Sequence, residues 1–451
     1  MLPENVLLEI FDLYRTTNQV YPSVGVWRWH RLVHVCRRWR HIVFASPHRL
    51  DLKIHCAFRT VRMDLGIWPA FPIIIDCGPF NFETGIDNLV ATLEHSDRVC
   101  HINIAIEGYM LGRMAKAMEK PFPVLTHLEI RSHNRIAQAL PAGFLGGSAP
   151  CLEKIHLRSI AFPALTTLLL SASDLVTLEL HKIPPSGYIS PEAMVVGLAA
   201  LHKLEIFVIE FQLAPPRSDR INPSPPPTTR TVLPSLTFFQ FRGASEYLEG
   251  LVARIDAPQL NKIAIDFLNQ LVDFQVAQLS KFIDRSAGLE LPLFRHAHLT
   301  FSNDGVAFVM SHAPRVMDYL PGHPITLISC QGIDWQVSHL AQVLSKFSAT
   351  LSNVIYLDLS VDPHNLRLKG TDDVEWLHLL HQFPTVQTLR VHRRQLAERI
   401  ALALEDITEE MVSGVLRSLD SISLAGQPAS SVKKFIALRQ ISGRPVTVKN
   451  T

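Results

Sequence analysis

The stretch Leu125–Ile130 reads LTHLEI, with apolar residues at its first, fourth and sixth positions. The same spacing returns in Leu152–Leu157, LEKIHL, and in Leu175–Leu180, LVTLEL. The last two apolar residues of each copy are separated by one polar residue, which is the alternation of a strand with one buried face. Each copy exposes an apolar edge that only a neighbouring copy can bury, so the pattern predicts a stacked array of strands.

Copies of this six-residue frame recur along most of the chain, with Ile, Val or Phe also allowed at the apolar positions. They begin at Val99, Leu125, Leu152, Leu165, Leu175, Leu204, Leu236, Leu260, Val354, Val386 and Leu419. Most gaps of about 23 to 34 residues leave room for one strand and one helix per repeat. The copies at Leu165 and Leu175 are too close for an intervening helix, so we expect an irregular array. An ordinary α/β domain with many leucine strands is the alternative.

Two helices between the copies carry their own start or stop signals. At Ser190-Pro191-Glu192, a capping serine precedes a proline at the first helical position, which predicts a helix reaching about Leu201. A last helix is expected over Ser430–Gln440, closed by Gly443. The proline-rich segment 214–234 has no periodic apolar face, and we interpret it as a loop projecting from the array.

The N-terminal segment predicts two helices that cannot stand alone. The first, in LPENVLLEIF from Leu2 to Phe11, is apolar on most sides and should extend to about Tyr14. The second, in LVHVCRRWRHIVF from Leu32 to Phe44, has one apolar and one basic face and should end before Ser46-Pro47. Fewer than about 50 residues rarely bury enough surface to fold without a metal or disulfide. Either the rest of the chain or another protein must therefore cover them.

These two motifs, in this order, resemble the F-box, which pairs a Leu-Pro helix start with a Val-Cys-Arg-x-Trp helix. The resemblance implies docking onto a Skp-type adaptor of cullin–RING ubiquitin ligases. It carries over to positions that would form the adaptor contact or the helical core behind it: Leu2, Pro3, Val6, Leu7, Ile10, Leu32, Cys36 and Trp39. The connection over residues 15–31 is longer than in the family, which leaves the placement of the middle helix open. The whole chain is similar to F-box proteins of mushroom-forming (basidiomycete) fungi, which continue with irregular leucine-rich segments.

Together, these patterns predict an α/β chain of two parts. Residues 1–48 should form a short, all-α, F-box-like helical module. Residues 49–451 should form an irregular leucine-rich-repeat solenoid with a parallel sheet and a proline-rich loop at 214–234. The resemblance implies a substrate-receptor subunit of an SCF-type ubiquitin ligase, whose leucine-rich array binds a protein target. A ligase-independent leucine-rich-repeat scaffold or protein-binding module is the alternative.

Net charge and cysteine spacing indicate which classes of partner and which cell compartment to expect. Lys and Arg number 43 against 41 Asp and Glu, a net charge of +2, which argues against nucleic acid as a partner of the whole chain. No apolar run is long enough for a membrane span, so no membrane partner is expected. The six cysteines are scattered without a C-x-x-C pair, which is typical of reduced thiols in a cytoplasmic or nuclear protein.

Outward-facing residues of the predicted strands form the candidate target-binding surface. In each frame the residues between the apolar positions should point to solvent along one polar stripe rich in His and Arg. Its predicted target-binding members are Arg131, His156, Arg158, Glu179, His181, Arg242, Arg390 and His392. A plain solvated strand face is the alternative for any single residue.

Catalytic and metal-binding signatures are missing from the sequence. It contains no G-x-S-x-G elbow, phosphate loop, G-x-G-x-x-G turn or H-E-x-x-H helix. The pair His296 and His298 would share one strand face, but spacing supplies no third ligand. We therefore predict no catalytic residue, no metal site and no cofactor. An enzyme built from dispersed residues is the remaining alternative.

Overall fold

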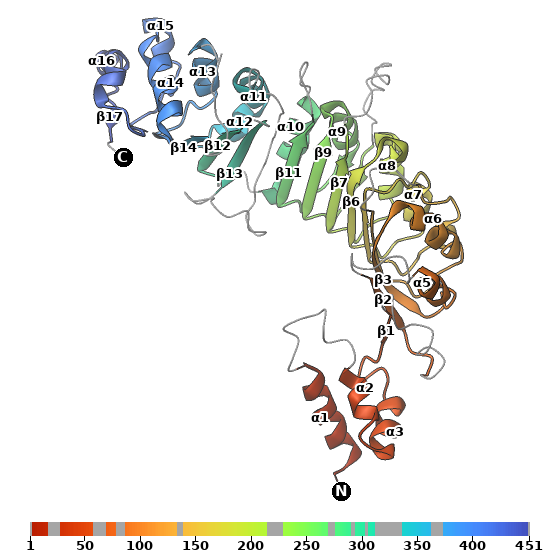
Figure 1. Ribbon diagram of the computed structural model, residues 1–451. Coiled ribbons are helices and arrows are strands. Elements are labelled where there is room, and N and C mark those ends of the chain that lie inside the picture. The colour runs from red at the N-terminus through yellow and green to blue at the C-terminus, as the bar shows by residue number, and fades with distance from the viewer. Residues whose placement is uncertain are drawn as a thin grey trace. The chain divides into compact units, whose positions relative to one another are not determined.

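The computed structural model of the chain (Figure 1) describes residues 2–16, 28–56, 69–77, 86–132, 139–213, 229–268, 276–289, 294–302, 305–311, 336–361 and 373–449. The chain divides into two compact units, Met1–Tyr188 and Ile189–Thr451. The domain boundary predicted after residue 48, between the helical module and the leucine-rich array, stays a prediction. No helix among the described residues combines the length and the apolar character needed to cross a bilayer.

Three helices, α1 (Glu4–Thr16), α2 (Arg28–Val33) and α3 (Arg37–Ala45), open the first unit. Phe11 of α1 is fully buried, and its ring centroid lies 4.8 Å from that of Trp39 on α3. Trp29 of α2 packs edge-on against Phe71, with ring centroids 5.7 Å apart, and its Nε1–H donates to the carbonyl of Lys53 at 3.1 Å. The helices are therefore packed onto the segment that leads into the sheet.

The prediction of one continuous helix over residues 32–44 is wrong. The chain turns at His34–Val35, and Cys36 takes an extended conformation as the N-cap of α3, its Sγ accepting from the Trp39 N–H at 3.4 Å. The Arg40 side chain donates from Nε to the Val33 carbonyl at 2.9 Å, which pairs the last carbonyl of α2. Val35, which lies within the range predicted for that helix, is 58% exposed. The predicted end before Ser46-Pro47 is confirmed, because α3 ends at Ala45.

The sheet of the first unit is parallel and follows the chain order. Its strands are β1 (Ile54–Cys56), β2 (Ile73–Cys77), β3 (Val99–Ile106), β4 (His127–Ser132), β5 (Lys154–Arg158) and β6 (Thr177–Ile183). The helices after β2 are α5 (Ile86–Leu93), α6 (Gly108–Ala117) and α7 (Leu165–Leu169), with 3₁₀ turns at η1 (Phe144–Gly147) and η2 (Pro185–Gly187). The unit is therefore a mixed α/β structure around a parallel sheet, as predicted.

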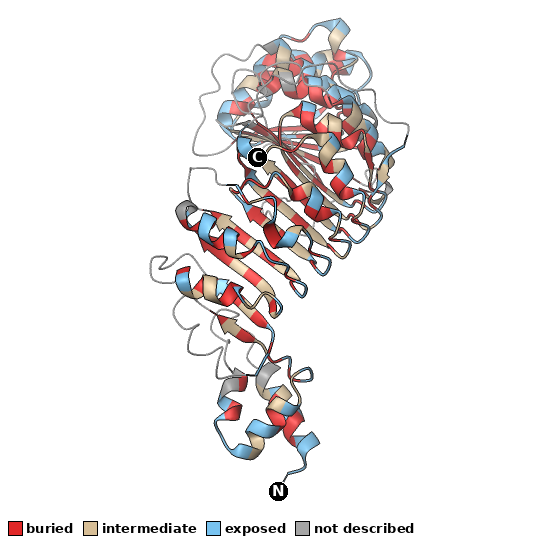
Figure 2. Ribbon diagram, turned by 90° about the vertical axis from the view of Figure 1, so that its right-hand side faces the viewer, coloured by how far each residue is buried: buried red, intermediate tan, exposed pale blue. Residues whose placement is uncertain are grey.

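The apolar frame positions form ladders across this sheet. The fourth positions of successive frames pair in register as Ile102, Leu128, Ile155 and Leu178. The sixth positions pair likewise as Ile104, Ile130, Leu157 and Leu180. All eight side chains are at most 3% exposed. Figure 2 shows buried and half-exposed residues alternating along the strands, so one face forms the core and the other faces solvent.

The frame at Leu165 does not form a strand, which corrects the sequence reading. Its residues form α7, where Leu165, Leu168 and Leu169 are buried while Leu170 is 53% exposed. The string LTTLLL satisfies both the strand frame and the i, i+3, i+4 spacing of a helix. Parallel strands need a crossover of about a dozen residues or more. Only 18 residues separate the end of β5 from the start of β6, so this segment must serve as the crossover.

The second unit holds two further groups of parallel strands. In the first group β7 (Ile206–Phe211), β9 (Phe238–Gly243) and β11 (Lys262–Phe267) pair in parallel. In the second, the order is β13 (Gly305–Ser311), β12 (His296–Ser302), β14 (Tyr356–Val361), β15 (Thr388–Val391), β16 (Ser421–Leu424) and β17 (Thr447–Val448). The β12–β13 pair is antiparallel and the other pairs are parallel. The frames at Leu204, Leu236, Leu260, Val354, Val386 and Leu419 all lead into strands, as predicted.

Helices connect the strands of the second unit. They are α8 (Pro191–Leu198), α9 (Ser245–Val252), α10 (Ala277–Arg285), α11 (Gln336–Leu344), α12 (Ser348–Leu351), α13 (Asp373–His381), α14 (Arg394–Glu405), α15 (Glu409–Val412) and α16 (Lys433–Ile441). Short 3₁₀ turns are η4 (Ala287–Leu289), η7 (Ser345–Phe347) and η8 (Ala429–Val432). Most of the predicted proline-rich loop, residues 214–228, lies outside the described residues. Its end forms β8 (Thr231–Val232), which pairs in parallel with β10 (Ile255–Asp256).

Both predicted helix signals are confirmed. The Ser190 hydroxyl caps α8 by accepting from the Ala193 N–H at 3.2 Å, and Pro191 is the first residue of that helix. Gly443 has a φ of +71° just after α16. Its N–H donates to the Gln440 carbonyl and that of Arg444 donates to the Arg439 carbonyl, which together close the helix.

Candidate functional site

The solvent-facing side of β4, β5 and β6 carries a grid of polar side chains in cross-strand register. One row pairs Glu129 with His156 and His156 with Glu179. The next row pairs Arg131 with Arg158 and Arg158 with His181. In-register residues on adjacent strands lie about 5 Å apart, so these residues are neighbours on one face of the sheet. Five of the predicted target-binding residues, Arg131, His156, Arg158, Glu179 and His181, are thus brought together in one place.

Hydrogen bonds tie the β4 end of this grid to the preceding strands. The Arg131 Nε lies 3.0 Å from Glu129 Oε1, and Arg131 Nη2 donates to Asn103 Oδ1 at 3.0 Å. Asn103 Nδ2 in turn donates to Asp76 Oδ1 at 3.1 Å. The carboxylate of Glu129 is therefore neutralised by its own strand neighbour, and polar contacts run without a gap from β2 to β4.

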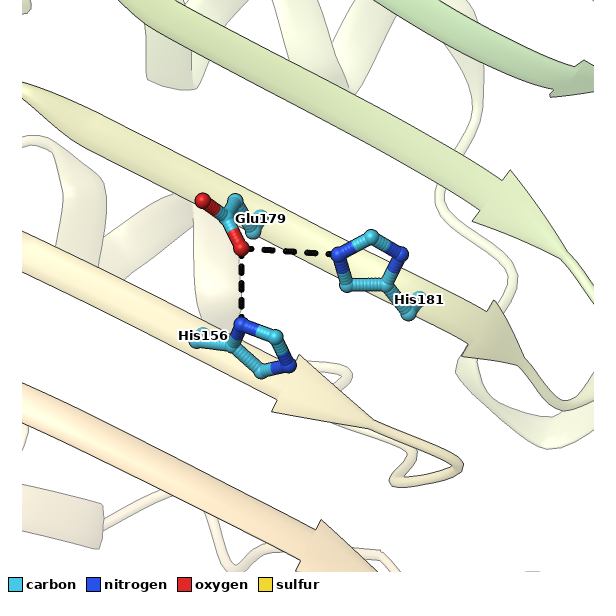
Figure 3. Close-up of side chains that lie close together, drawn as sticks. All are labelled: His156, Glu179 and His181. Atoms are coloured by element: carbon cyan, nitrogen blue, oxygen red, sulfur yellow. Dashed lines mark hydrogen bonds and ion pairs between the residues drawn. The ribbon is translucent and has the colours of Figure 1, made fainter. Parts of the chain in front are cut away.

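His156, Glu179 and His181 form a closer cluster at the β5–β6 pair (Figure 3). Glu179 Oε2 lies 2.7 Å from His156 Nδ1 and 3.5 Å from His181 Nε2. The two imidazole rings are 4.8 Å apart between centroids, tilted by 36°. Hydrogen bonds from His156 and then His181 hold the pKa of the Glu179 carboxyl well below its ordinary value. The cluster therefore presents a fixed negative charge between two imidazoles.

One atom of this cluster has no hydrogen-bond partner among the described residues. His156 Nε2 is buried and unpaired, although the other ring nitrogen faces Glu179. An unpaired buried polar atom costs about 1–3 kcal/mol. Among the described residues, the hydrogen-bonding capacity of the His156 ring is therefore only half used.

The other predicted target-binding residues lie in the second unit, in two separate groups. Arg242 of β9 pairs with Asp266 of β11, with Nε 3.3 Å from Oδ2. On the other strand group, His392 lies just past β15, with Nε2 3.4 Å from Asp358 Oδ1, and Arg390 is exposed on β15. The target-binding role of these residues stays a prediction.

The histidine pair that sequence spacing suggested for a metal does not converge on one point. The His296 ring stacks on Tyr356, with centroids 4.4 Å apart, while His298 Nε2 lies 3.0 Å from the Ser360 hydroxyl. Burial lowers the pKa of both rings. Each imidazole thus contacts a different neighbour on β14.

A second candidate surface lies on α1, which has two apolar faces. Leu7, Leu8 and Phe11 are buried against α2 and α3. On the other face, exposed apolar residues follow at spacings of four and three: Val6, Ile10 and Leu13. Leu2, also exposed, lies two residues before the helix begins. We call these four residues the exposed α1 face.

The eight residues predicted for adaptor contact or module core separate between these two roles. Leu7 and Leu32 are buried in the module, and Trp39 is half-buried against Phe11. Exposed members are Leu2, Pro3, Val6, Ile10 and Cys36. Sequence reasoning did not select Leu13 or Val35, which are 64% and 58% exposed. The periodicity of α1 could have identified Leu13, since it follows Ile10 by three residues, as Ile10 follows Val6 by four.

Comparisons with known proteins do not assign the chain to a family. No protein-family model matches the chain, and no curated protein matches it either. Among solved structures, the chain is similar to the leucine-rich repeat-containing protein LegL7 from Legionella pneumophila, with 14% sequence identity and a TM-score of 0.28. The match covers 77% of this chain and 99% of that one. A likeness at this TM-score supports no conclusion about function.

Proposed function

We propose that the chain is a non-enzymatic substrate-receptor subunit of an SCF-type ubiquitin ligase, acting in the cytoplasm or nucleus. The helical module α1–α3 docks onto a Skp-type adaptor, and the solvent-facing sheet holds a protein target. The identity of the adaptor comes from the F-box resemblance of the first helices. The chain contributes binding and positioning, while other subunits transfer ubiquitin.

The observation that carries the proposal is the exposed α1 face. Three large apolar side chains in one helical stripe, with Leu2 just before the helix, lie opposite a buried stripe and favour a partner that covers them. Packing an apolar helix face into a groove of another protein is a common recognition mode. Within the described part of the chain, α1 packs one side against α2 and α3, while Val6 and Ile10 on the other side are exposed; this supports the inference that the second side meets another protein.

The polar grid on β4–β6 supports the target-binding half of the proposal. Its side chains are held by contacts such as Arg131 to Glu129 and His156 to Glu179, so little side-chain entropy remains to be lost on binding. Arg158 is exposed between them and offers a fork of donors for a carboxylate or phosphate group. A partner with acidic residues spaced to meet Arg158 and its neighbours fits this surface.

The test is co-expression of the full chain with a Skp-type adaptor, followed by purification of the complex. Ile10→Asp places a charge in the exposed α1 face and should abolish the complex without unfolding the chain. Leu402→Asp is the matched control, because Leu402 is an exposed leucine on α14, far along the chain. Trp39→Ala is a poor test, since its ring packs on Phe11 and its loss would also damage the module.

The outcomes separate the proposal from a ligase-independent scaffold. Loss of the complex in Ile10→Asp alone, with Leu402→Asp unaffected, supports adaptor docking. A wild-type chain that is soluble yet forms no complex with the adaptor contradicts it. If a protein target is then found that binds equally well to wild type and Ile10→Asp in the absence of the adaptor, the scaffold function is the better description.

A further inference from the structure

The side chains of His156, Glu179 and His181 are placed together by the backbone alone. His156 on β5 and Glu179 on β6 are in-register partners of a parallel pair. His181 follows Glu179 by two residues, so it lies on the same face of the same strand. The positions are therefore fixed by the sheet and not by a flexible loop.

Their potential ligand atoms converge on one point. One ligand atom from each of the three residues lies within 4.8 Å of the other two. Figure 3 shows His156 Nδ1 and His181 Nε2 both turned toward the same carboxylate oxygen of Glu179. Zinc binds nitrogen and carboxylate oxygen at about 2.0–2.2 Å, so ligands in a tetrahedral site lie about 3.4 Å apart. The observed separations of 2.7 Å and 3.5 Å bracket that value, and small rotations of the His156 and Glu179 side chains would open the first.

We propose that His156, Glu179 and His181 form a binding site for a divalent transition-metal ion such as Zn²⁺. Two imidazoles and one carboxylate suit zinc, cobalt and iron(II), and three protein ligands leave a coordination position open to solvent. The side chains are 15%, 20% and 19% exposed, so the site is sheltered yet reachable. The open position would accept a water molecule or a side chain of a bound protein.

The surroundings of Glu179 differ from those of the other glutamate beside His156, which supports a ligand at this cluster. The same face offers a contrast: Glu129, which also neighbours His156, has its carboxylate held by Arg131. Glu179 contacts two imidazoles instead.

The test uses the purified full chain, stripped of metal with a chelator and titrated with Zn²⁺ and with Co²⁺. Wild type should bind one equivalent in a saturable step, seen by calorimetry and by a visible absorption band of bound Co²⁺. His156→Ala, His181→Ala and the conservative Glu179→Gln should each weaken that step at least about tenfold, the loss found even when only a partner of a metal ligand is removed. Zn²⁺ should raise the thermal midpoint of wild type and not of these variants.

His127→Ala is the matched control, since His127 is an imidazole on the same face of the neighbouring strand. Its ring stacks on His101, and its Nδ1 lies 2.9 Å from the Thr126 hydroxyl, so its loss should leave the step unchanged. The chain has 21 histidines, so weak binding of several equivalents is expected background. Absence of a one-equivalent step in wild type overturns the site, as does a step that persists in folded Glu179→Gln and His181→Ala. Metal binding is measured on the chain alone, without the adaptor. Its result is therefore independent of whether the proposed adaptor docking is correct.

Discussion

The neighbouring residues Leu169 and Leu170 offer a sharp test of how the chain between β5 and β6 is folded. The strand frame places Leu170 in the core, whereas in α7 it is Leu169 that is fully buried and Leu170 that is 53% exposed. We therefore compare Leu169→Ala with Leu170→Ala, the same chemical change one position apart. Leucine and alanine are both good helix formers, so differences in helix propensity stay small.

The expected free-energy changes differ widely between the two variants. Truncating a buried leucine to alanine destabilises a protein by about 2–5 kcal/mol, through lost apolar burial and the cavity left behind. Leu169 should fall in this range, because its side chain has no exposed surface. A substitution at a surface position is usually within about 0.5 kcal/mol, which is the range expected for Leu170.

Hydrogen exchange is the suitable assay, because a chain of two compact units has no single free energy of unfolding. Amides of β5 and β6, which α7 connects, report the opening of this part of the first unit. In Leu169→Ala their exchange should accelerate by about 30-fold to 4,000-fold, since each 1.4 kcal/mol is a factor of ten. In Leu170→Ala the rates should change by no more than a few-fold.

The reverse order of the two effects would refute the assignment of α7. If Leu170→Ala accelerated exchange as much as Leu169→Ala or more, residue 170 would have to be buried, as the strand frame requires. The crossover between β5 and β6 would then need a different path.

Two further predictions concern titration and a buried charge. Burial lowers the pKa of His55 and His101 below the ordinary 6.5, with His127 adding to the effect at His101 and Asp76 opposing it at both. Below pH 6.5 the unfolded chain binds more protons than the folded one, so stability of the first unit should fall as pH drops from 6.5 toward the lowered values. As pH drops, the urea concentration at which the first unit is half unfolded should fall less in a His55→Gln, His101→Asn variant than in the wild type. An equal fall in both would contradict the role of these two histidines. Separately, Arg439 is 1% exposed and donates to the carbonyls of Arg417 and Leu419 at 3.1 and 3.0 Å. Arg439→Met should destabilise the C-terminal strands by about 1.5–3 kcal/mol, seen as faster hydrogen exchange of the β16 amides. The control is Arg444→Met, which replaces an exposed arginine. Equal effects of the two substitutions would contradict a stabilising role for the buried Arg439 side chain.

Much of the sheet could be predicted because the strand signal is local. In ten of the eleven frames the fourth and sixth positions lie in strands, since alternation over a few residues suffices to bury one face. The exception at Leu165 has a string compatible with both periods, and topology decides between them. β12 lacks a full frame because Ala297 occupies the position of the middle leucine, although it pairs in register with Leu357.

The candidate site was predictable only in part. Alternation along β4, β5 and β6 predicted that His156, Glu179 and His181 point outward. That they meet at 2.7 and 3.5 Å depends on the register between strands 23 residues apart, which no local pattern contains. On α1 the sequence indicated an apolar surface all round, and only packing against α2 and α3 distinguished buried Phe11 from exposed Ile10.

The sequence by itself determined most of the strand segments, which residues of those strands face inward, and where capped helices such as α8 and α16 begin or end. These properties depend on side-chain period and on backbone chemistry within a few residues. Tertiary structure alone decided which face of α1 is buried, the helical state of Leu165–Leu169 and the meeting of His156 with Glu179. Each of these follows from contacts between segments distant in the chain, or from the length of a crossover, where several local conformations cost nearly the same free energy.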